Sequence, residues 1–221
     1  MNEKQLAGEK AVEFVKSGMV LGLGTGSTVY FTIVKIGELV KNGLQIKAVS
    51  TSAATTRLAE SLRIPLVSIN EVESIDLTID GADEVDQAFN AIKGGGGALF
   101  FEKVVALASK QVIWVVDSQK RVEQLGQFPL PVEVTPFGHT HVLARLAAQG
   151  LNPAVRKVEE RPYLTDSGNY IIDLHLGRLE RPSELNETLN AMTGVVEHGL
   201  FLKVAQTVIV GRTDTADVLT R

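Results

Sequence analysis

The sequence contains no cysteine, which excludes disulfide bonds, thiolate catalysis and cysteine-ligated zinc or iron–sulfur centres. It also has no uninterrupted apolar run of membrane-spanning length, and no basic region followed by an apolar stretch near its start. Aromatic residues make up only 5% of the chain, no basic stripe is interleaved with them, and the formal net charge is −4. We therefore expect a cytoplasmic protein that binds neither nucleic acid nor a membrane.

The first half of the chain alternates short apolar runs with segments of helical periodicity. With 221 residues and 44% hydrophobic content, the chain is long enough to bury a sizeable core. The candidate strands are 19–24, 45–50, 65–68, 75–80 and 111–117, and the candidate helices are 5–16, 28–40, 53–62 and 98–110. This alternation is typical of an α/β domain in which helices connect the strands of a Rossmann-like parallel sheet.

The pattern changes at Pro129 and Pro131, after which the order strand, helix, two strands, helix, strand follows. That βαββαβ order predicts a smaller inserted α+β domain of the ferredoxin-like type. The closing run 207–210 has the composition of a last strand that rejoins the first sheet. We predict a catalytic domain formed by residues 1–127 and 201–221, and a small domain formed by residues 128–200.

Four consecutive glycines at positions 94–97 are the most informative motif. Glycine in an ordered segment gives up more backbone entropy than any other residue, so such a run indicates a linker or a loop that approaches a ligand closely. The flanking residues are apolar, which favours the loop. Lys93 precedes the run, and Glu102 follows it beside Phe100 and Phe101, whose apolar rings favour a carboxylate that acts as a base. Lys103 is expected to be a solvated neighbour.

A second glycine-rich segment, GTGST at positions 24–28, follows the first candidate strand and opens a helix. Backbone N–H groups at a helix N-terminus bind anions, so a phosphate site is one interpretation. The nucleotide-binding patterns do not match, because Ser27 stands where the third glycine would be and no P-loop lysine is present. The simpler alternative is a glycine turn in which Ser27 caps the helix.

Asp80 and Asp83 lie at the carboxyl end of the fourth candidate strand. Two carboxylates that flank a glycine suit hydrogen bonds to sugar hydroxyls or proton transfer, although structural aspartate turns are also common. A metal site ranks last, because these residues do not follow the calcium-loop spacing and no histidine lies nearby in the sequence. The four histidines, all in the predicted small domain, are interpreted as structural or surface residues.

Four motifs in this order closely resemble the ribose-5-phosphate isomerase A family over almost the whole chain. They are GTGST at 24–28, DGADE at 80–84, IKGGGGAL at 92–99 with Glu102 and Lys103, and FPLPVEV at 128–134. The resemblance implies an aldose-ketose isomerase of the non-oxidative pentose phosphate pathway that interconverts ribose 5-phosphate and ribulose 5-phosphate through an enediolate. It also implies a homo-oligomer, a dimer or a tetramer, that needs neither a cofactor nor a metal.

The resemblance implies roles for individual residues as well. Glu102 matches the proton-transferring base, Asp80 and Asp83 the carboxylates that handle sugar hydroxyls and ring opening, and Lys93 the cation near the developing oxyanion. The residues matched to substrate binding are Thr25, Gly26, Ser27, Thr28, Asp80, Gly81, Ala82, Asp83, Lys93, Gly94, Gly95, Gly96 and Lys120. The phosphate contact that some relatives make from the N-terminal segment is left unassigned, since Glu9 and Lys10 stand there.

Two competing functions remain open at this point. A non-catalytic sugar-phosphate sensor can share the same sheet architecture and would explain GTGST, but not a retained base. A CoA-transferase can use a glutamate nucleophile on a related sheet, and trapping of a glutamyl thioester with hydroxylamine would support it. A direct assay with ribose 5-phosphate distinguishes the isomerase from both.

Overall fold

The computed structural model describes residues 2–221, and the chain divides into two compact units. The first unit consists of Met1–Ala82, Phe101–Arg121 and Lys203–Arg221. The second unit consists of Asp83–Phe100 and Val122–Leu202. The boundaries of these units differ from those of the predicted domains, chiefly because residues 83–100, which include the glycine run, belong to the second unit. The division into domains therefore stays a prediction.

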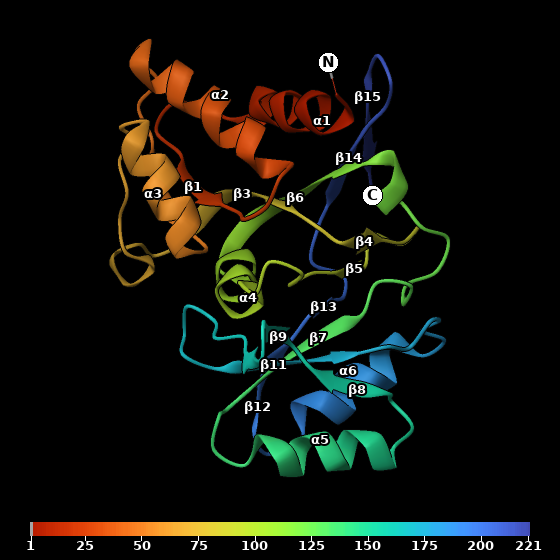
Figure 1. The fold of residues 1–221 in the computed structure, drawn as a ribbon. Coiled ribbons are helices and arrows are strands. Elements are labelled where there is room, and N and C mark those ends of the chain that lie inside the picture. Colours follow the sequence, from red (N-terminus) through yellow and green to blue (C-terminus); the bar gives the residue numbers. More distant parts are fainter. Residues whose placement is uncertain (1) are drawn as a thin grey trace. The chain divides into compact units, whose positions relative to one another are not determined.

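The first unit contains a six-stranded sheet with the strand order β15-β14-β6-β3-β1-β2 (Figure 1). The five strands β14, β6, β3, β1 and β2 run parallel, and β15 pairs antiparallel with β14 at one edge. The strands are β1 (Val20–Leu23), β2 (Lys47–Ser50), β3 (Ile75–Gly81), β6 (Ser109–Asp117), β14 (Thr207–Gly211) and β15 (Ala216–Thr220). The prediction that the last apolar run rejoins this sheet is confirmed by its parallel pairing with β6.

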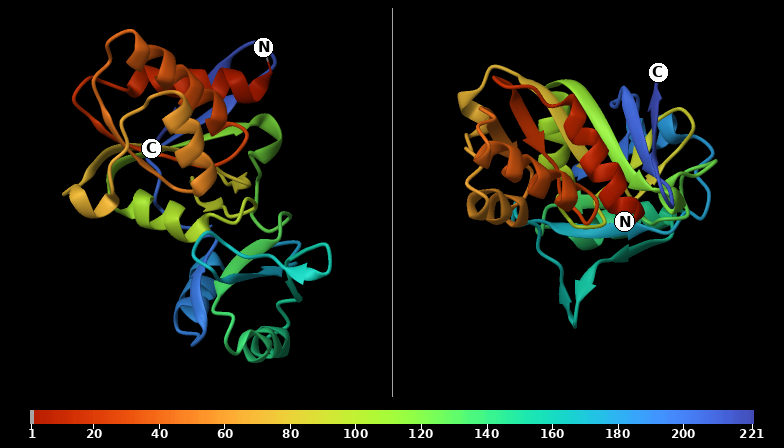
Figure 2. Two further views of the ribbon diagram at one scale, coloured as in Figure 1. Left: turned by 60° about the vertical axis from the view of Figure 1, so that its left-hand side comes forward. Right: turned by 90° about the horizontal axis from the view of Figure 1, so that it is seen from above.

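The helices of this unit are those that the periodicity predicts, with different ends. They are α1 (Glu3–Ala11), α2 (Val29–Lys41) and α3 (Ala53–Ser61), and three short 3₁₀ turns are η1 (Val12–Phe14), η2 (Ile69–Glu71) and η3 (Ser118–Lys120). Figure 2 shows α1 and α2 lying side by side against the sheet. Their apolar faces form one core with Leu77 and Ile79 of β3 and Ile113 and Val115 of β6. This core fixes the sheet whose carboxyl ends carry the candidate site.

Two predictions for this region are wrong. Residues 65–68 do not form a strand and make only an isolated bridge between Leu66 and Ala48, because Pro65 has no N–H to donate to a ladder. Helix α4 (Leu99–Leu107) ends before residue 110, since β6 already begins at Ser109. Within α4, Val105 is buried, whereas Val104 is 40% exposed.

The second unit contains a four-stranded antiparallel sheet with the order β12-β7-β11-β8. Its elements are β7 (Leu130–Val134), α5 (His139–Ala148), β8 (Pro153–Val155), β11 (Tyr170–Leu174), α6 (Pro182–Asn190) and β12 (Val195–His198). Numbered within the unit, the strands lie in the order fourth, first, third, second, which is the ferredoxin-like arrangement predicted from βαββαβ. Val132, Val134, Ile172 and Leu174 pack with α5 and α6, so the neighbouring residues of β7 and β11 point to the opposite face.

Five shorter strands in the second unit were not predicted. Strands β4 (Glu84–Val85), β5 (Ala91–Ile92) and β13 (Leu200–Phe201) form a three-stranded antiparallel sheet, and β9 (Lys157–Val158) pairs with β10 (Arg161–Pro162). Each has only two residues, which is too short to show a periodicity. The three-stranded sheet holds the residues that lead into the glycine run, and helix α4 follows the run. Within residues 2–221, no helix is both long and apolar enough to cross a membrane.

Candidate active site

The glycine-rich loop at residues 24–28 connects the end of β1 to the start of α2. Position 24 excludes any side chain, because a Cβ atom there would lie 2.0 Å from Oδ1 of Asp80. Gly26 has a φ of +126°, which side chains rarely adopt. The helix begins after Thr28, which makes no side-chain capping bond, so the interpretation of Ser27 as the helix cap is wrong.

Asp80 holds this loop in place from the end of the neighbouring strand β3. Its Oδ1 accepts hydrogen bonds from the Thr25 N–H at 2.9 Å and from the Gly81 N–H at 2.7 Å, and the residue is fully buried. Hydrogen bonds from N–H groups to an ionised carboxylate are among the stronger ones in proteins. Asp80 and the GTGST loop therefore form one structural assembly, although they lie 55 residues apart in the sequence.

Hydroxyl groups from three segments gather behind the loop. The Thr25 hydroxyl lies 2.8 Å from that of Thr51, 2.8 Å from that of Ser52 and 3.1 Å from that of Thr55. Thr55 in turn donates to the Gly24 carbonyl at 2.8 Å, and Ser52 caps the N-terminus of α3. The loop is thus tied to the ends of two strands and to a helix, which gives it a fixed shape despite its glycines.

A lysine that was not predicted reaches this loop. The Nζ atom of Lys4, on α1, donates a hydrogen bond to the Ser27 hydroxyl at 3.0 Å. The two residues are 23 positions apart, and Lys4 looks like any charged residue on the surface of a helix. No sequence pattern therefore predicts this contact. Lys4 therefore places an ammonium group of the N-terminal helix beside the predicted phosphate loop.

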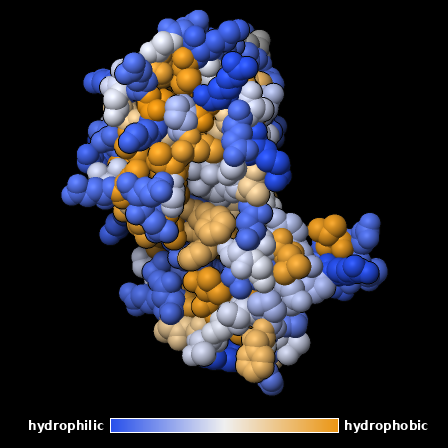
Figure 3. Space-filling view, turned by 90° about the vertical axis from the view of Figure 1, so that its left-hand side faces the viewer, coloured by the Kyte–Doolittle hydropathy of each residue, from blue (hydrophilic) through white to orange (hydrophobic). Residues whose placement is uncertain are grey.

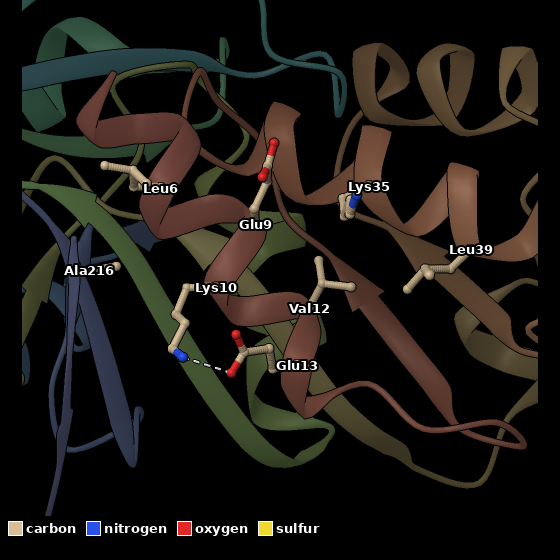
Figure 4. A pocket seen from close by; sticks show the side chains of 8 residues that line it. All are labelled: Leu6, Glu9, Lys10, Val12, Glu13, Lys35, Leu39 and Ala216. Carbon is tan, nitrogen blue, oxygen red and sulfur yellow. Dashed lines mark hydrogen bonds and ion pairs between the residues drawn. The ribbon is translucent and has the colours of Figure 1, made fainter. Parts of the chain in front are cut away.

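A pocket of about 660 Å³ lies against the same loop. Thr25, Gly26, Ser27, Tyr30 and Thr55 line it together with Lys4 and the apolar side chains Val29, Phe31, Ile33 and Leu58. Figure 3 shows apolar atoms gathered between polar ones on the part of the surface where α2 and α3 lie. A second pocket, of about 440 Å³, lies between α1 and α2 and contains the ion pair of Lys10 and Glu13, but none of the predicted site residues (Figure 4).

Lys120 lies in η3, just after β6, and its Nζ atom donates to the carbonyl of Ala82 at 2.8 Å. Ala82 follows the end of β3, so the lysine spans the carboxyl ends of two neighbouring parallel strands. The side chain is only partly exposed, so Lys120 is not a freely solvated surface lysine. The predicted positions Gly81, Ala82 and Lys120 therefore lie together.

Glu102 lies in the first turn of α4, as predicted, and is only 4% exposed. Its neighbour Lys103 is 8% exposed, so the expectation of a solvated lysine is wrong. The exposed positions of α4 are instead apolar: Val104 is 40% exposed and Leu107 is 69% exposed. Burial of charged side chains on a helix that leaves valine and leucine outside is unfavourable for stability, and such departures are expected at functional or strained sites.

In the second unit, Asp83 contacts the glycine run directly. Its Oδ2 accepts a hydrogen bond from the Gly95 N–H at 2.7 Å, and its own N–H donates to the Ile92 carbonyl at 2.8 Å. Gly94 and Gly97 have φ values of +101° and +80°, which explains why glycine is required at these two turns. Asp83, Gly94, Gly95 and Gly96 are thus brought together, as predicted from their motifs.

Lys93 is one of the most deeply buried charged residues of the chain, with an exposed fraction of 1%. Its backbone N–H donates to the Gly199 carbonyl at 2.9 Å, which continues the pairing of β5 with β13. Its Nζ atom lies 5.5 Å from the centroid of the Phe201 ring, a cation–π distance. Burial of an ammonium group costs free energy unless the group is paired, so a lysine at this depth is a candidate functional residue.

Glu84, the last residue of the DGADE motif, has a structural task. Its two carboxylate oxygens accept the N–H groups of Gly126 and Phe128, both at 2.7 Å, and the residue is 4% exposed. It therefore fastens the segment that leads into β7. Within residues 2–221, no group of three or more histidine or acidic side chains has the arrangement of a metal site.

Replacing Gly24 with alanine should disrupt the assembly of the loop with Asp80. The added methyl group would overlap the Asp80 carboxylate, and forcing extra atoms into a packed region costs about 1–3 kcal/mol. We expect a lower free energy of unfolding in thermal melts and a reduced activity on the proposed substrate. Gly26→Ala is the control for stability, since its added Cβ would meet nothing within 4 Å and only the positive φ of this residue opposes the substitution. Equal stability and activity of Gly24→Ala and the parent chain would contradict this steric argument.

A glycine turn at the end of β1, acidic residues at the end of β3 and a lysine after β6 lie at the carboxyl edge of a parallel sheet. This edge is where α/β enzymes bind their ligands. The arrangement defines an α/β enzyme that acts on a small anionic molecule.

Comparison with known proteins identifies the particular family. The sequence model of ribose 5-phosphate isomerase A (phosphoriboisomerase A) matches residues 47–215. Ribose-5-phosphate isomerase A of Levilactobacillus brevis is 54% identical over 98% of this chain and 96% of its own length. The structure of ribose 5-phosphate isomerase A from Methanocaldococcus jannaschii matches with a TM-score of 0.93 and 36% identity, covering 99% of this chain and 98% of that one. The chain belongs to the ribose 5-phosphate isomerase A family, which confirms the resemblance seen in its motifs.

One further structure bears on the ligand. It is that of a D-ribose-5-phosphate isomerase in complex with phospho-erythronic acid, with a TM-score of 0.95, 37% identity and full coverage of both chains. The α/β fold class expected from the sequence is confirmed by these matches.

Proposed function

We propose that this chain interconverts ribose 5-phosphate and ribulose 5-phosphate through an enediolate, as a step of the non-oxidative pentose phosphate pathway. The observation that carries the proposal is the 54% identity, over almost the whole chain, to a ribose-5-phosphate isomerase A. Phospho-erythronic acid, bound by the related isomerase, carries a phosphate and a planar anionic carboxylate that resembles the planar, negatively charged end of a phosphorylated enediolate. Formation of ribulose 5-phosphate from ribose 5-phosphate by the purified chain tests the proposal, and no turnover would refute it.

In the proposed reaction Glu102 removes the proton from C2 of the open-chain aldose and returns it to C1 of the ketose. Lys93 stabilises the negative charge that develops on the oxygen of the enediolate. Asp80 and Asp83 handle the sugar hydroxyls and the opening of the ring, with Gly81 and Ala82 close by in the chain. Isomerisation needs a base, an oxyanion partner and an anchor for the phosphate, and Glu102 and Lys93 are proposed to supply the first two.

We propose that the phosphate binds at the loop of residues 24–28, through Thr25, Gly26, Ser27 and Thr28. Support comes from the Gly26 conformation, the fixed hydroxyl of Thr25 and the contact of Lys4 with Ser27. Lys120 and the glycines Gly94, Gly95 and Gly96 are the further substrate-binding positions. A homo-oligomer, as a dimer or a tetramer, and a cytoplasmic location are proposed on the family resemblance alone.

Removing either candidate cation of the phosphate site should weaken substrate binding more than it slows the chemical step. Lys4→Ala and Lys120→Ala are each expected to raise KM for ribose 5-phosphate about tenfold with a smaller change in kcat, since phosphate contacts act on ground and transition states alike. Lys16→Ala, on the surface outside the loop, is the matched control. Unphosphorylated ribose should be a poor substrate, and equal kcat/KM for ribose and its phosphate would contradict the anchor.

Activity should survive exhaustive chelation, because the proposed roles of Asp80 and Asp83 are to hold hydroxyls and protons rather than a cation. The measurement is the initial rate after prolonged dialysis against a strong chelator. A loss of activity that returns on addition of a divalent ion would overturn the assignment of these two carboxylates.

A further inference from the structure

The glycine run is held from outside by one arginine. Nη1 of Arg156 donates to the Gly94 carbonyl at 2.9 Å and to the Gly95 carbonyl at 3.1 Å. The remainder of the guanidinium faces Asp173, with Nε to Oδ2 at 2.8 Å and Nη2 to Oδ1 at 2.5 Å. Both side chains are 16% exposed, so this bidentate ion pair is largely shielded from water. Asp173 lies on β11 and points away from the helices, so the sheet provides a rigid base for the arginine.

A tyrosine adds the next contact along the run. The hydroxyl of Tyr163 donates to the Gly96 carbonyl at 3.2 Å, and its ring lies 5.9 Å from the Arg156 guanidinium carbon. Burial, and then the charge of Asp166, raise the pKa of the Tyr163 phenol, which therefore stays protonated and donates near neutral pH. The loop that carries the tyrosine is fastened to buried Glu133, which accepts from Thr165 and Asn169 at 2.9 Å each.

By holding the carbonyl groups of the glycine run, these contacts also fix the directions in which the N–H groups of the same peptide units point. All peptide bonds described are trans, so the carbonyl of one residue and the N–H of the next point in opposite directions. Because Arg156 holds the Gly94 carbonyl, the Gly95 N–H points away from it, toward Oδ2 of Asp83 at 2.7 Å. Arg156 also holds the Gly95 carbonyl, so the Gly96 N–H points away from the arginine, and Gly96 itself is exposed.

We propose that Arg156, held by Asp173, is a positioning residue that orients the Gly95 and Gly96 N–H groups and, through Gly95, the Asp83 carboxylate toward the sugar. The inference rests on the proposed function and deepens it. Four glycines in sequence have the greatest backbone freedom of any segment, so an uncontrolled loop would spend little time in the reactive arrangement. Tyr163 supports the same arrangement at Gly96.

The proposal is tested with Arg156→Met, which keeps the apolar stem and removes all five donors. Because a small displacement of reacting groups costs about 10²-fold in rate, kcat for ribose 5-phosphate should fall about 10²-fold. KM should change much less than kcat, since the proposed phosphate contacts involve other residues and only the sugar contacts of the glycine run are disturbed. Arg161→Met, an exposed arginine of β10, is the matched control and should leave both constants unchanged.

Rescue distinguishes positioning from a general loss of structure. Guanidinium at a non-denaturing concentration should restore at least part of kcat in Arg156→Ala and leave the parent chain unaffected. Tyr163→Phe, which removes a single hydrogen bond, should lower kcat by less than about tenfold and serves if the arginine variants do not fold. A folded Arg156→Met variant with the parent kcat would overturn the inference.

Failure of the proposed function would look different. An inactive parent chain would refute the isomerase proposal, and the role of Arg156 is then decided by amide exchange at residues 94–97. In the parent chain, Arg156 is paired with Asp173 and holds the glycine run so that the Gly95 N–H donates to Asp83. Arg156→Met must therefore accelerate hydrogen exchange of the Gly95 N–H. Unchanged exchange there would refute the positioning role independently of any activity.

Discussion

Replacing Glu102 with glutamine should lower kcat for ribose 5-phosphate by about 10²–10⁴-fold, the usual contribution of a general base. Glutamine preserves the shape of the side chain and removes its basic oxygen. Substrate should still bind, so KM should change little, because the proposed phosphate contacts remain intact. The measurement is steady-state kinetics of ribulose 5-phosphate formation at several pH values.

A matched control separates loss of the base from loss of a buried carboxylate. Glu84 is also 4% exposed, and its two oxygens accept backbone N–H groups in a structural contact. Glu84→Gln should therefore lower the free energy of unfolding by about 1–3 kcal/mol, since one of these N–H groups loses its acceptor, with kcat largely retained. Near-parent turnover by Glu102→Gln would remove this residue from the role of base.

Deuterated water tests the route that Glu102 is proposed to take. Transfer through a carboxylic acid that exchanges with solvent puts some deuterium on the product carbon, whereas a direct hydride shift keeps the original hydrogen. Partial incorporation is the expected result, measured by mass spectrometry of the product. Complete retention of hydrogen would count against the enediolate, unless proton return is faster than exchange.

The periodic parts of the fold could be predicted from the sequence because they follow from local patterns. The alternation of apolar runs and helical stripes correctly predicted the parallel sheet, and the βαββαβ order predicted the ferredoxin-like sheet. The secondary-structure predictions failed where a tertiary contact or a single residue determines whether a strand forms. Pro65 stops a strand that its apolar neighbours favour, and the two-residue strands around the glycine run are stabilised only by their partners.

The site was predictable as motifs, while its internal contacts were not. Glycine runs and paired acids stand out because ordinary packing does not require them. The hydrogen bond of Lys4 to Ser27 joins residues 23 positions apart, and that of Arg156 to Gly94 joins residues 62 positions apart. No local sequence pattern predicts contacts between residues so far apart in the chain. Helix α4 shows the opposite case. An amphipathic interpretation places Val104 inside and Lys103 outside, and the structure reverses both, a departure of the kind that is expected at functional or strained sites.

Replacing Lys93 with methionine should lower kcat by about 10²–10³-fold, the loss expected when one group that stabilises an oxyanion is removed. Methionine approximates the length of the buried stem, which is 1% exposed, and keeps apolar contact with the Phe201 ring. Thermal melts identify the variants that fold, since removal of one partner of a buried charged contact also lowers stability. A much slower reaction in a chain that remains folded is what a cation retained for chemistry predicts.

The separate effects of Lys93→Met on kcat and on KM show which role the Lys93 ammonium group has. A cation that acts on the developing enediolate lowers kcat and kcat/KM together, whereas one that only binds the sugar raises KM and spares kcat. Lys93→Arg retains the charge but places it on a larger planar group, so it should restore little of the rate. Lys157→Met, an exposed lysine of β9, controls for the change in net charge. An unchanged kcat in folded Lys93→Met would leave the oxyanion without its proposed partner and would shift the role to the N–H groups of the glycine run.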